Sequence, residues 1–495
     1  MSLVGLEFAF FFPIVFLAHW LGPRRAAWQN AVLLLASVVF YATWNLGLLG
    51  VLAAATAVSF GAGLALDALG TPAPDAAPSA PGRRRRKAVL VVAIVAELGL
   101  LGVFKYSGFF AESFNALLVG LGLPDALPVL RLVLPLGISY TTLIQVGYLL
   151  EVYWGRAPAC RDPLAYMVFV GFFPQLIAGP IVRARVMLPQ YLVPRRLTSA
   201  AVASGAGAFL LGFVMKAFVA DWLSPRVVDP VFADPSSFGA ATLWIALLGY
   251  ATQLFCDFAG YSLMAIGTGR LFGLELPENF RYPFLSKSLA EFWRRWHISL
   301  NTWLFDYLFA PLTTGRSWFR GRAGAGFLVV FLVSGLWHGA TWTYVLWGLA
   351  HGIALAGHHA YDEWYKRKCR KDRRWVAWRK ATPYVLASWF VTQVFFILTL
   401  VPFRAPSIGA AADFGKGLLG LGGAEGLGQR FGLQAAACVL FFAGYHLLEV
   451  GPGPAWKARF LALPAPVRGV VYGLVLAFLL VYVPVGASTF IYAQF

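Results

Sequence analysis

Residues 83–106 read Arg-Arg-Arg-Arg-Lys-Ala-Val-Leu-Val-Val-Ala-Ile-Val-Ala-Glu-Leu-Gly-Leu-Leu-Gly-Val-Phe-Lys-Tyr, a basic run followed by an apolar stretch. The apolar part, 88–106, has close to the roughly 20 residues that a helix needs to cross a bilayer. Clusters of Lys and Arg beside a span mark cytoplasmic loops under the positive-inside rule. The segment therefore predicts a membrane-spanning helix that starts on the cytoplasmic side.

The rest of the chain has a similar composition. Of its 495 residues, 59% are hydrophobic and 13% are charged, whereas soluble globular proteins carry about 25% charged residues. The net charge is +18, but because the basic residues gather between apolar runs we expect anionic lipid headgroups, and no nucleic acid, to meet them. A soluble enzyme with one anchor is excluded. The predicted fold class is an all-α polytopic membrane protein.

Apolar runs between polar or basic breaks predict the individual helices. They lie near residues 6–21, 30–47, 49–66, 88–106, 132–153, 199–222, 239–266, 324–358 (a broken pair), 382–403, 433–450 and 468–492. Length and run count together predict about 11–13 spans. Basic loops on the inside, among them 359–381, place the N-terminus and the C-terminus outside the membrane.

Three segments depart from the alternation of span and short loop. Residues 166–181 are interrupted by Pro and Gly, which predicts a re-entrant segment covered by protein. Residues 71–87, rich in Pro, Ala and Arg, predict a disordered cytoplasmic loop. Residues 291–307 place their large apolar side chains on one helical face and polar ones opposite, which predicts an interfacial amphipathic helix or a cavity wall.

Histidine is the residue type best placed for chemistry. His338 lies between two short apolar runs and is flanked by Gly335 and Gly339, which would let a substrate or another segment approach the ring. An ionisable ring at membrane depth is a functional candidate, although a packing histidine bonded to a carbonyl is the alternative. His297 lies at the edge of the apolar face of 291–307, with Asn301 four residues on.

Other kinds of site find less support in the sequence. The chain has no Gly-x-Ser-x-Gly elbow for a serine nucleophile. Its four cysteines are scattered without metal-ligand spacing, so we expect no metal site and no bound cofactor. General acid–base catalysis remains, in which a histidine takes a proton from a hydroxyl as it attacks an acyl group.

Several motifs resemble those of the membrane-bound O-acyltransferase family, in particular its bacterial polysaccharide-acetylating and teichoic-acid D-alanylating branch. They are Gln-Leu-Phe-Cys-Asp-Phe-Ala-Gly-Tyr-Ser at 253–262, Pro-Glu-Asn-Phe at 277–280, Glu-Phe-Trp-Arg-Arg-Trp-His-Ile-Ser-Leu at 291–300, Gly-Leu-Trp-His-Gly at 335–339, Trp-Gly at 347–348 and His-Gly at 351–352. The resemblance runs from about residue 11 to 404. It implies an acyltransferase core at 1–430, with helices around a central channel, and further transmembrane helices at 431–495.

The resemblance also implies roles for individual residues. His338 matches the family's essential histidine and His297 its second one. The residues that we expect to bind or orient substrate are Arg294, Arg295, Asn301, Asp257, Gln253 and Trp337. The donor, acetyl-CoA by this likeness, would enter from the cytoplasm. A periplasmic or extracellular relay partner and a polysaccharide acceptor would meet the acyl group on the far side.

The expected function is therefore O-acetylation of an exported or cell-surface polysaccharide, with His338 as general base. Leu263, where an acid is usual after Tyr-Ser, and Leu-Ser-Lys at 285–287 resemble the D-alanyl type and leave the acyl group open, and Phe305 is a further departure where Arg is usual. D-alanyl or other acyl transfer from a carrier protein is the first alternative. A non-enzymatic transporter or flippase is the second, although the sequence has no evident internal repeat.

Overall fold

The computed structural model describes residues 1–70, 81–130, 132–315, 318–426 and 429–482. Regular structure in these ranges is helical, apart from one isolated bridge between Phe238 and Glu425. The all-α prediction is confirmed. The chain divides into two compact units, Met1–Phe209 with Met264–Pro277, and Leu210–Leu263 with Glu278–Phe495.

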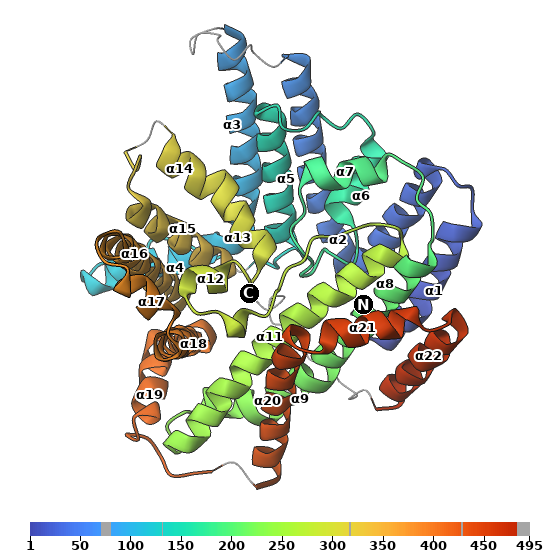
Figure 1. Cartoon of the computed structure of the whole chain (residues 1–495). Helices are drawn as coiled ribbons and strands as arrows, with labels where there is room; N and C mark the ends of the chain where they lie inside the picture. Colours follow the sequence, from blue (N-terminus) through green and yellow to red (C-terminus); the bar gives the residue numbers. More distant parts are fainter. Residues whose placement is uncertain (71–80, 131, 316–317, 427–428, 483–495) are drawn as a thin grey trace. The chain divides into compact units, whose positions relative to one another are not determined.

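The first unit is built from the N-terminal helices, in which α2, α3 and α5 pack against one another (Figure 1). Its helices are α1 (Leu6–Leu21), α2 (Ala26–Ala68), α3 (Pro81–Leu101), α4 (Ser107–Gly120), α5 (Ile138–Tyr153), α6 (Pro163–Gly171), α7 (Ala184–Tyr191) and most of α8 (Ser199–Phe213). A π-helical turn at Gly102–Tyr106 joins α3 to α4.

The second unit carries the remaining helices, and α15 and α16 form a tightly packed pair within it (Figure 1). Its helices are α9 (Asp221–Leu223), α10 (Asp229–Ala233), most of α11 (Ala240–Leu271), α12 (Leu289–Trp293), α13 (Ile298–Leu304), α14 (Ala310–Thr314), α15 (Ala323–His338), α16 (Trp342–Lys371), α17 (Arg374–Lys380), α18 (Thr382–Arg404), α19 (Ile408–Leu418), α20 (Gln429–Val450), α21 (Gly453–Ala462) and α22 (Ala465–Tyr482).

Five helical stretches among the described residues are long and apolar enough to cross a membrane. They are Ala26–Ala68, Gly82–Gly120, Ser199–Ala233, Ala240–Leu271 and Thr382–Arg404, and the bent pair Gly432–Leu448 and Gly453–Ala462 would add a sixth. The polytopic membrane class is confirmed. The long helices are fewer than the predicted spans partly because 30–47 and 49–66 are two limbs of α2, divided at Asn45 (φ −162°, ψ 111°).

The predicted break within 324–358 is confirmed, since α15 ends at His338 and α16 begins at Trp342. Glycines set the distance between the two helices: a side chain at Gly335 would overlap the main chain of Tyr344, and one at Gly348 would overlap that of Phe331. The predicted loop 359–381 is wrong in its first half, because α16 continues to Lys371.

The prediction of a disordered loop over 71–87 is also wrong where the structure describes it. Residues 71–80 lie outside the described residues, but 81–87 form the first turns of α3. Arg86 is 1% exposed, and its guanidinium donates to the carbonyls of Leu66, Gly70 (2.7 Å) and Tyr153 (3.0 Å). These carbonyls end helices α2 and α5, where backbone acceptors lack helical partners.

Two further segments are interrupted, one as predicted and one not. In 166–181, helix α6 ends at Gly171 and buried turns follow, so this segment is no continuous span, as predicted. The single amphipathic helix predicted at 291–307 is wrong. It consists of α12, a non-helical turn at 294–297, α13 and a π-helical turn that starts at Phe305.

Arg86→Ala should destabilise the first unit, because the buried carbonyls of two helix ends lose a charged donor. We expect a loss of about 3 kcal/mol and a clearly lower melting temperature in detergent. Arg84→Ala is the matched control, since Arg84 is exposed at the start of the same helix. Equal melting temperatures for the two variants would contradict the assigned role of Arg86.

Candidate active site

His338 is the last residue of α15 and lies in an aromatic pocket. The ring is 5% exposed, and its centroid lies 5.2 Å from Trp347 on α16 and 5.3 Å from Phe403 on α18, both edge to face. These contacts come from three helices of the second unit. The surroundings are mostly apolar, so water has little access to the imidazole.

His297 lies in the turn between α12 and α13 and has an unusual backbone. Its φ is 44° and its ψ is 52°, a left-handed conformation that costs a non-glycine residue about 1–2 kcal/mol. The ring is 3% exposed and packs edge to face on Phe258, 4.6 Å between centroids. Its Nδ1 accepts a 3.4 Å hydrogen bond from the amide of Leu300.

Trp337 brings the two histidines into one site. Its ring centroid lies 5.9 Å from that of His297 and 5.0 Å from that of His338. The indole therefore lies against both imidazoles. The structure therefore places the two catalytic candidates and Trp337, a substrate-binding candidate, close together.

A cavity of about 700 Å³ lies in the second unit, and His297, Trp337 and His338 do not line it. Its walls come from α12, α13, α15 and α16 and are mainly apolar, with Arg294, Asn301 and His358 among the polar residues. Trp293 forms part of the wall and lies 5.8 Å from Trp347, ring to ring. Because Trp347 contacts His338, two indoles connect the cavity wall with the histidine.

The remaining predicted binding residues separate into different environments. Arg294 is exposed and lines the cavity, whereas Arg295 donates to Glu291 at 2.7 Å and is absent from the cavity wall. Asn301 lines the cavity, but its amide donates to the carbonyls of Trp296 (2.6 Å) and His297 (3.2 Å). Arg294 is thus the better placed of the two arginines for a ligand.

Asp257 lies in a buried ion cluster. Lys216 Nζ is 2.5 Å from Asp257 Oδ1 and 2.7 Å from Asp221 Oδ1, and all three side chains are at most 3% exposed. Lys216 and Asp221 were not predicted; the available signal was the presence of two ionisable residues inside the apolar run 199–222. Gln253, one turn before Asp257 on α11, is 3% exposed, and its Oε1 has no hydrogen-bond partner in the described part of the chain.

His351 is a further buried histidine near the site. Its Nε2 lies 3.0 Å from the hydroxyl of Thr399, and that hydroxyl donates to the carbonyl of Phe396 at 2.6 Å. The Thr399 proton is therefore committed, so Nε2 of His351 carries the hydrogen. The ring also packs on Trp347, 4.7 Å between centroids.

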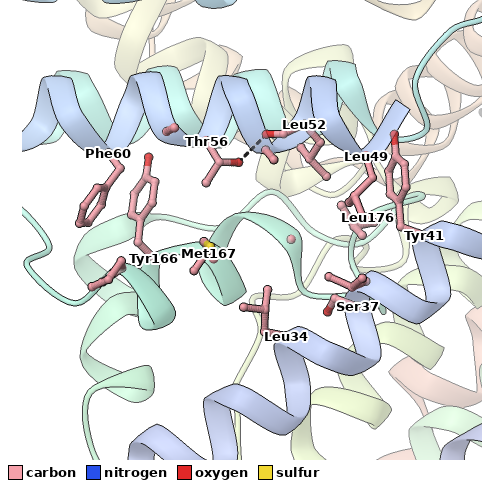
Figure 2. Close-up of a pocket in the computed structure, with 15 residues that line it drawn as sticks. Leu34, Ser37, Tyr41, Leu49, Leu52, Thr56, Phe60, Tyr166, Met167 and Leu176 are labelled. Atoms are coloured by element: carbon pink, nitrogen blue, oxygen red, sulfur yellow. Dashed lines mark hydrogen bonds between the residues drawn. The ribbon is translucent and has the colours of Figure 1, made fainter. Parts of the chain in front are cut away.

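A second hollow, of about 350 Å³, lies in the first unit between the two limbs of α2 and α6 (Figure 2). The hydroxyl of Thr56 bonds to Leu52 of its own helix at 2.7 Å, as Figure 2 shows, and that of Ser37 bonds to Leu33. The walls therefore present hydrocarbon. No predicted site residue lines this hollow.

Metal chemistry gains no support from the described residues, which contain no group of three or more His, Cys, Asp or Glu side chains placed to hold an ion. The site is thus a pair of histidines joined by an indole and connected through Trp347 and Trp293 to a mainly apolar cavity. Such an arrangement suits proton transfer and the exclusion of water.

Comparisons with known proteins find several similar chains. A family model described as MBOAT, membrane-bound O-acyltransferase family, matches residues 160–401. The probable alginate O-acetylase AlgI of Azotobacter vinelandii is 39% identical over 368 residues, covering 74% of this chain and 70% of the relative. The peptidoglycan O-acetyltransferase of Helicobacter pylori is 33% identical and covers 83% and 78%. The teichoic acid D-alanyltransferase of Bacillus subtilis is 30% identical and covers 54% and 69%.

Lys216→Met should strongly destabilise the second unit, because two buried carboxylates would lose the ammonium between them. We expect a loss of about 3–5 kcal/mol, read as a lower melting temperature or poor accumulation in the membrane. Adding Asp257→Asn should recover part of the loss. Lys416→Met, which breaks the exposed Lys416–Asp413 pair, should cost at most about 1 kcal/mol. Similar losses for both lysines would refute the buried cluster.

Proposed function

The chain belongs to the membrane-bound O-acyltransferase family, and on this premise we propose that it acetylates an exported or cell-surface polysaccharide. It is a multi-pass membrane protein and an acyltransferase. The proposal for the acetyl group is supported by relatives named as alginate O-acetylase and peptidoglycan O-acetyltransferase. We propose acetyl-CoA on the cytoplasmic side as donor.

His338 acts as the general base in this proposal. It takes the proton of the acceptor hydroxyl, the oxygen bonds to the carbonyl carbon of the donor, and the proton passes to the departing thiolate. The position of His338 at the C-terminus of α15 supports this role. The negative end of the helix dipole stabilises the imidazolium that forms during the step.

His297 acts as a neutral hydrogen-bond donor. Burial lowers the pKa of His297 to about 3, so the ring is uncharged at physiological pH. Because Nδ1 accepts from the amide of Leu300, the hydrogen is on Nε2. This nitrogen can donate to a substrate oxygen but cannot take a proton from one. The two histidines therefore have different roles, one as base and one as hydrogen-bond donor. The contact of both rings with Trp337 is the observation on which the proposal rests.

The cavity beside Trp293 is the proposed donor site. Its volume of about 700 Å³ falls within the range of roughly 300–1,000 Å³ typical of ligand pockets. Its mainly apolar walls suit an acyl chain and a pantetheine arm, and the exposed Arg294 is available for a phosphate. Two indoles lead from this wall to His338.

Transfer of D-alanyl from a carrier protein is the second candidate, favoured by the D-alanyltransferase relative and by Leu263 after Tyr-Ser. Membership of an enzyme family argues against a transporter or flippase. We further propose a bacterial inner-membrane location, both termini outside, and a periplasmic or extracellular relay partner between this protein and the polymer.

Loss of His338 should abolish acylation. We expect His338→Ala to lose the acyl ester of the surface polysaccharide, and His297→Ala to lose at least about nine-tenths of it, in cells matched for membrane level. His446→Ala is the control, because this buried histidine on α20 bonds to the carbonyl of Phe442 and packs on Phe255 and Phe284. Full ester content with His338→Ala would overturn the base assignment.

The donor is identified separately with inverted membrane vesicles. Labelled acetyl-CoA should transfer its acetyl group to membrane or polymer acceptors with the wild type and fail with His338→Ala. Labelling that depends on a carrier protein, and not on acetyl-CoA, would support the D-alanyl candidate.

The lowered pKa of His297 predicts a pH-dependent stability. The folded pKa of about 3 lies below the unfolded value of about 6.5, so protons bind preferentially to the unfolded chain between these values. The contribution of His297 to the free energy of unfolding is complete above pH 6.5. It falls as the pH is lowered toward 3, by up to about 1.4 kcal/mol per pH unit. His297→Gln should show a smaller fall in melting temperature between pH 7 and 4.5. An unchanged fall would contradict a buried neutral ring.

A further inference from the structure

The left-handed turn at His297 is held by a residue distant in sequence. Asn279 is 1% exposed, and its main-chain oxygen accepts the amide of Ile298 at 2.9 Å. Its side-chain Oδ1 accepts the hydroxyl of Ser299 at 2.8 Å and the amide of Ser299 at 3.3 Å. The two residues that follow His297 are thus both bonded to one asparagine outside the helix.

These bonds complete the cap of α13. The first amides of a helix have no partner within it, and here the first two, of Ile298 and Ser299, bond to Asn279. The third, of Leu300, bonds to the ring of His297. A residue in the left-handed conformation is atypical at an N-cap, so Asn279 supplies acceptors that a local cap would normally provide.

The other side of the turn is held by Asn301. Its amide donates to the carbonyls of Trp296 and His297, while Asn279 takes the amides that follow His297. Asn279 is itself fixed, because its Nδ2 donates to Ser262 on α11 at 3.1 Å. The imidazole is therefore flanked by two side-chain amides that bond to the backbone on either side of it.

We propose that Asn279 is a positioning residue for acyl transfer, which acts by fixing the turn that aims the His297 ring at Trp337. The inference rests on the proposed function and deepens it. Without the Oδ1 acceptor, the backbone at His297 relaxes to an ordinary conformation and the ring leaves its place between Phe258 and Trp337. Asn301, expected from sequence to bind substrate, shares the positioning role.

Two substitutions at Asn279 separate its acceptor from its volume. Asn279→Asp keeps an oxygen for Ser299, whereas Asn279→Leu keeps the size and loses the acceptor. In the inverted membrane vesicles of the donor assay, supplied with labelled acetyl-CoA, we expect Asn279→Leu to lower kcat about 10- to 100-fold with KM little changed. Asn279→Asp should stay within about 5-fold of wild type. Equal rates for the two variants would overturn the proposal.

A double-mutant cycle tests whether Asn279 acts through His297. Adding Asn279→Leu to His297→Gln should change kcat by less than about 3-fold, because the ring to be positioned is absent. The full loss in both backgrounds would mean a general structural role. If Asn279→Leu does not fold, Ser262→Ala takes its place in the double-mutant cycle. This milder substitution removes the hydroxyl to which Asn279 Nδ2 donates, and the same two outcomes apply.

Asn115 provides the matched control. It is a buried asparagine of the first unit whose amide likewise bonds to a loop, at Leu127 (2.8 and 3.0 Å) and Ala126 (3.2 Å). Asn115→Leu should lower the melting temperature but leave kcat per folded molecule unchanged. Turnover by the wild type is the reference. If the wild type shows no turnover, the proposed function fails. If the wild type turns over but the effects of Asn279→Leu and His297→Gln on kcat are additive, only the role of Asn279 is refuted.

Discussion

The close contact between α15 and α16 is the constraint on which the candidate site depends. Gly335 and Gly348 let the two main chains approach to a distance that any side chain would prevent. This approach brings Trp347 against the ring of His338. The same helix then places His351 beside Trp347 and bonds it to Thr399 on α18. Two positions without side chains therefore fix the aromatic surroundings of the proposed base.

In each unit, several polar groups removed from water have partners from other parts of the chain. Arg86 serves the helix ends of the first unit, and Asn279 serves the start of α13 in the second. Lys216 joins two buried carboxylates. Each arrangement meets the same physical demand, because a buried polar group without a partner costs more than a hydrogen bond gains.

Much of the helical framework could be predicted from local patterns. The apolar run at 6–21 is α1, that at 382–403 is α18 to within one residue, and the break at 339–341 follows from two short apolar halves. The two histidines were found by type and by motif. The predictions that were wrong depend on contacts between distant residues. A basic, Pro-rich stretch is predicted to be disordered unless the carbonyls that accept from Arg86 are known. The turn at His297 was missed for the same reason, since helical periodicity contains no information about Asn279.

The dependence of His338 on main-chain contact has an evolutionary consequence. The spacing of α15 and α16 is set by glycine-to-backbone packing and does not depend on the side chains that line the cavity. The cavity is different, because its walls are side chains such as Arg294, Phe305 and Asp362, each replaceable without moving α15 against α16. Selection can therefore alter the proposed donor site while the contact between α15 and α16 is inherited unchanged. In a fold organised in this way, substitutions in the cavity wall alone can change which substrate is bound.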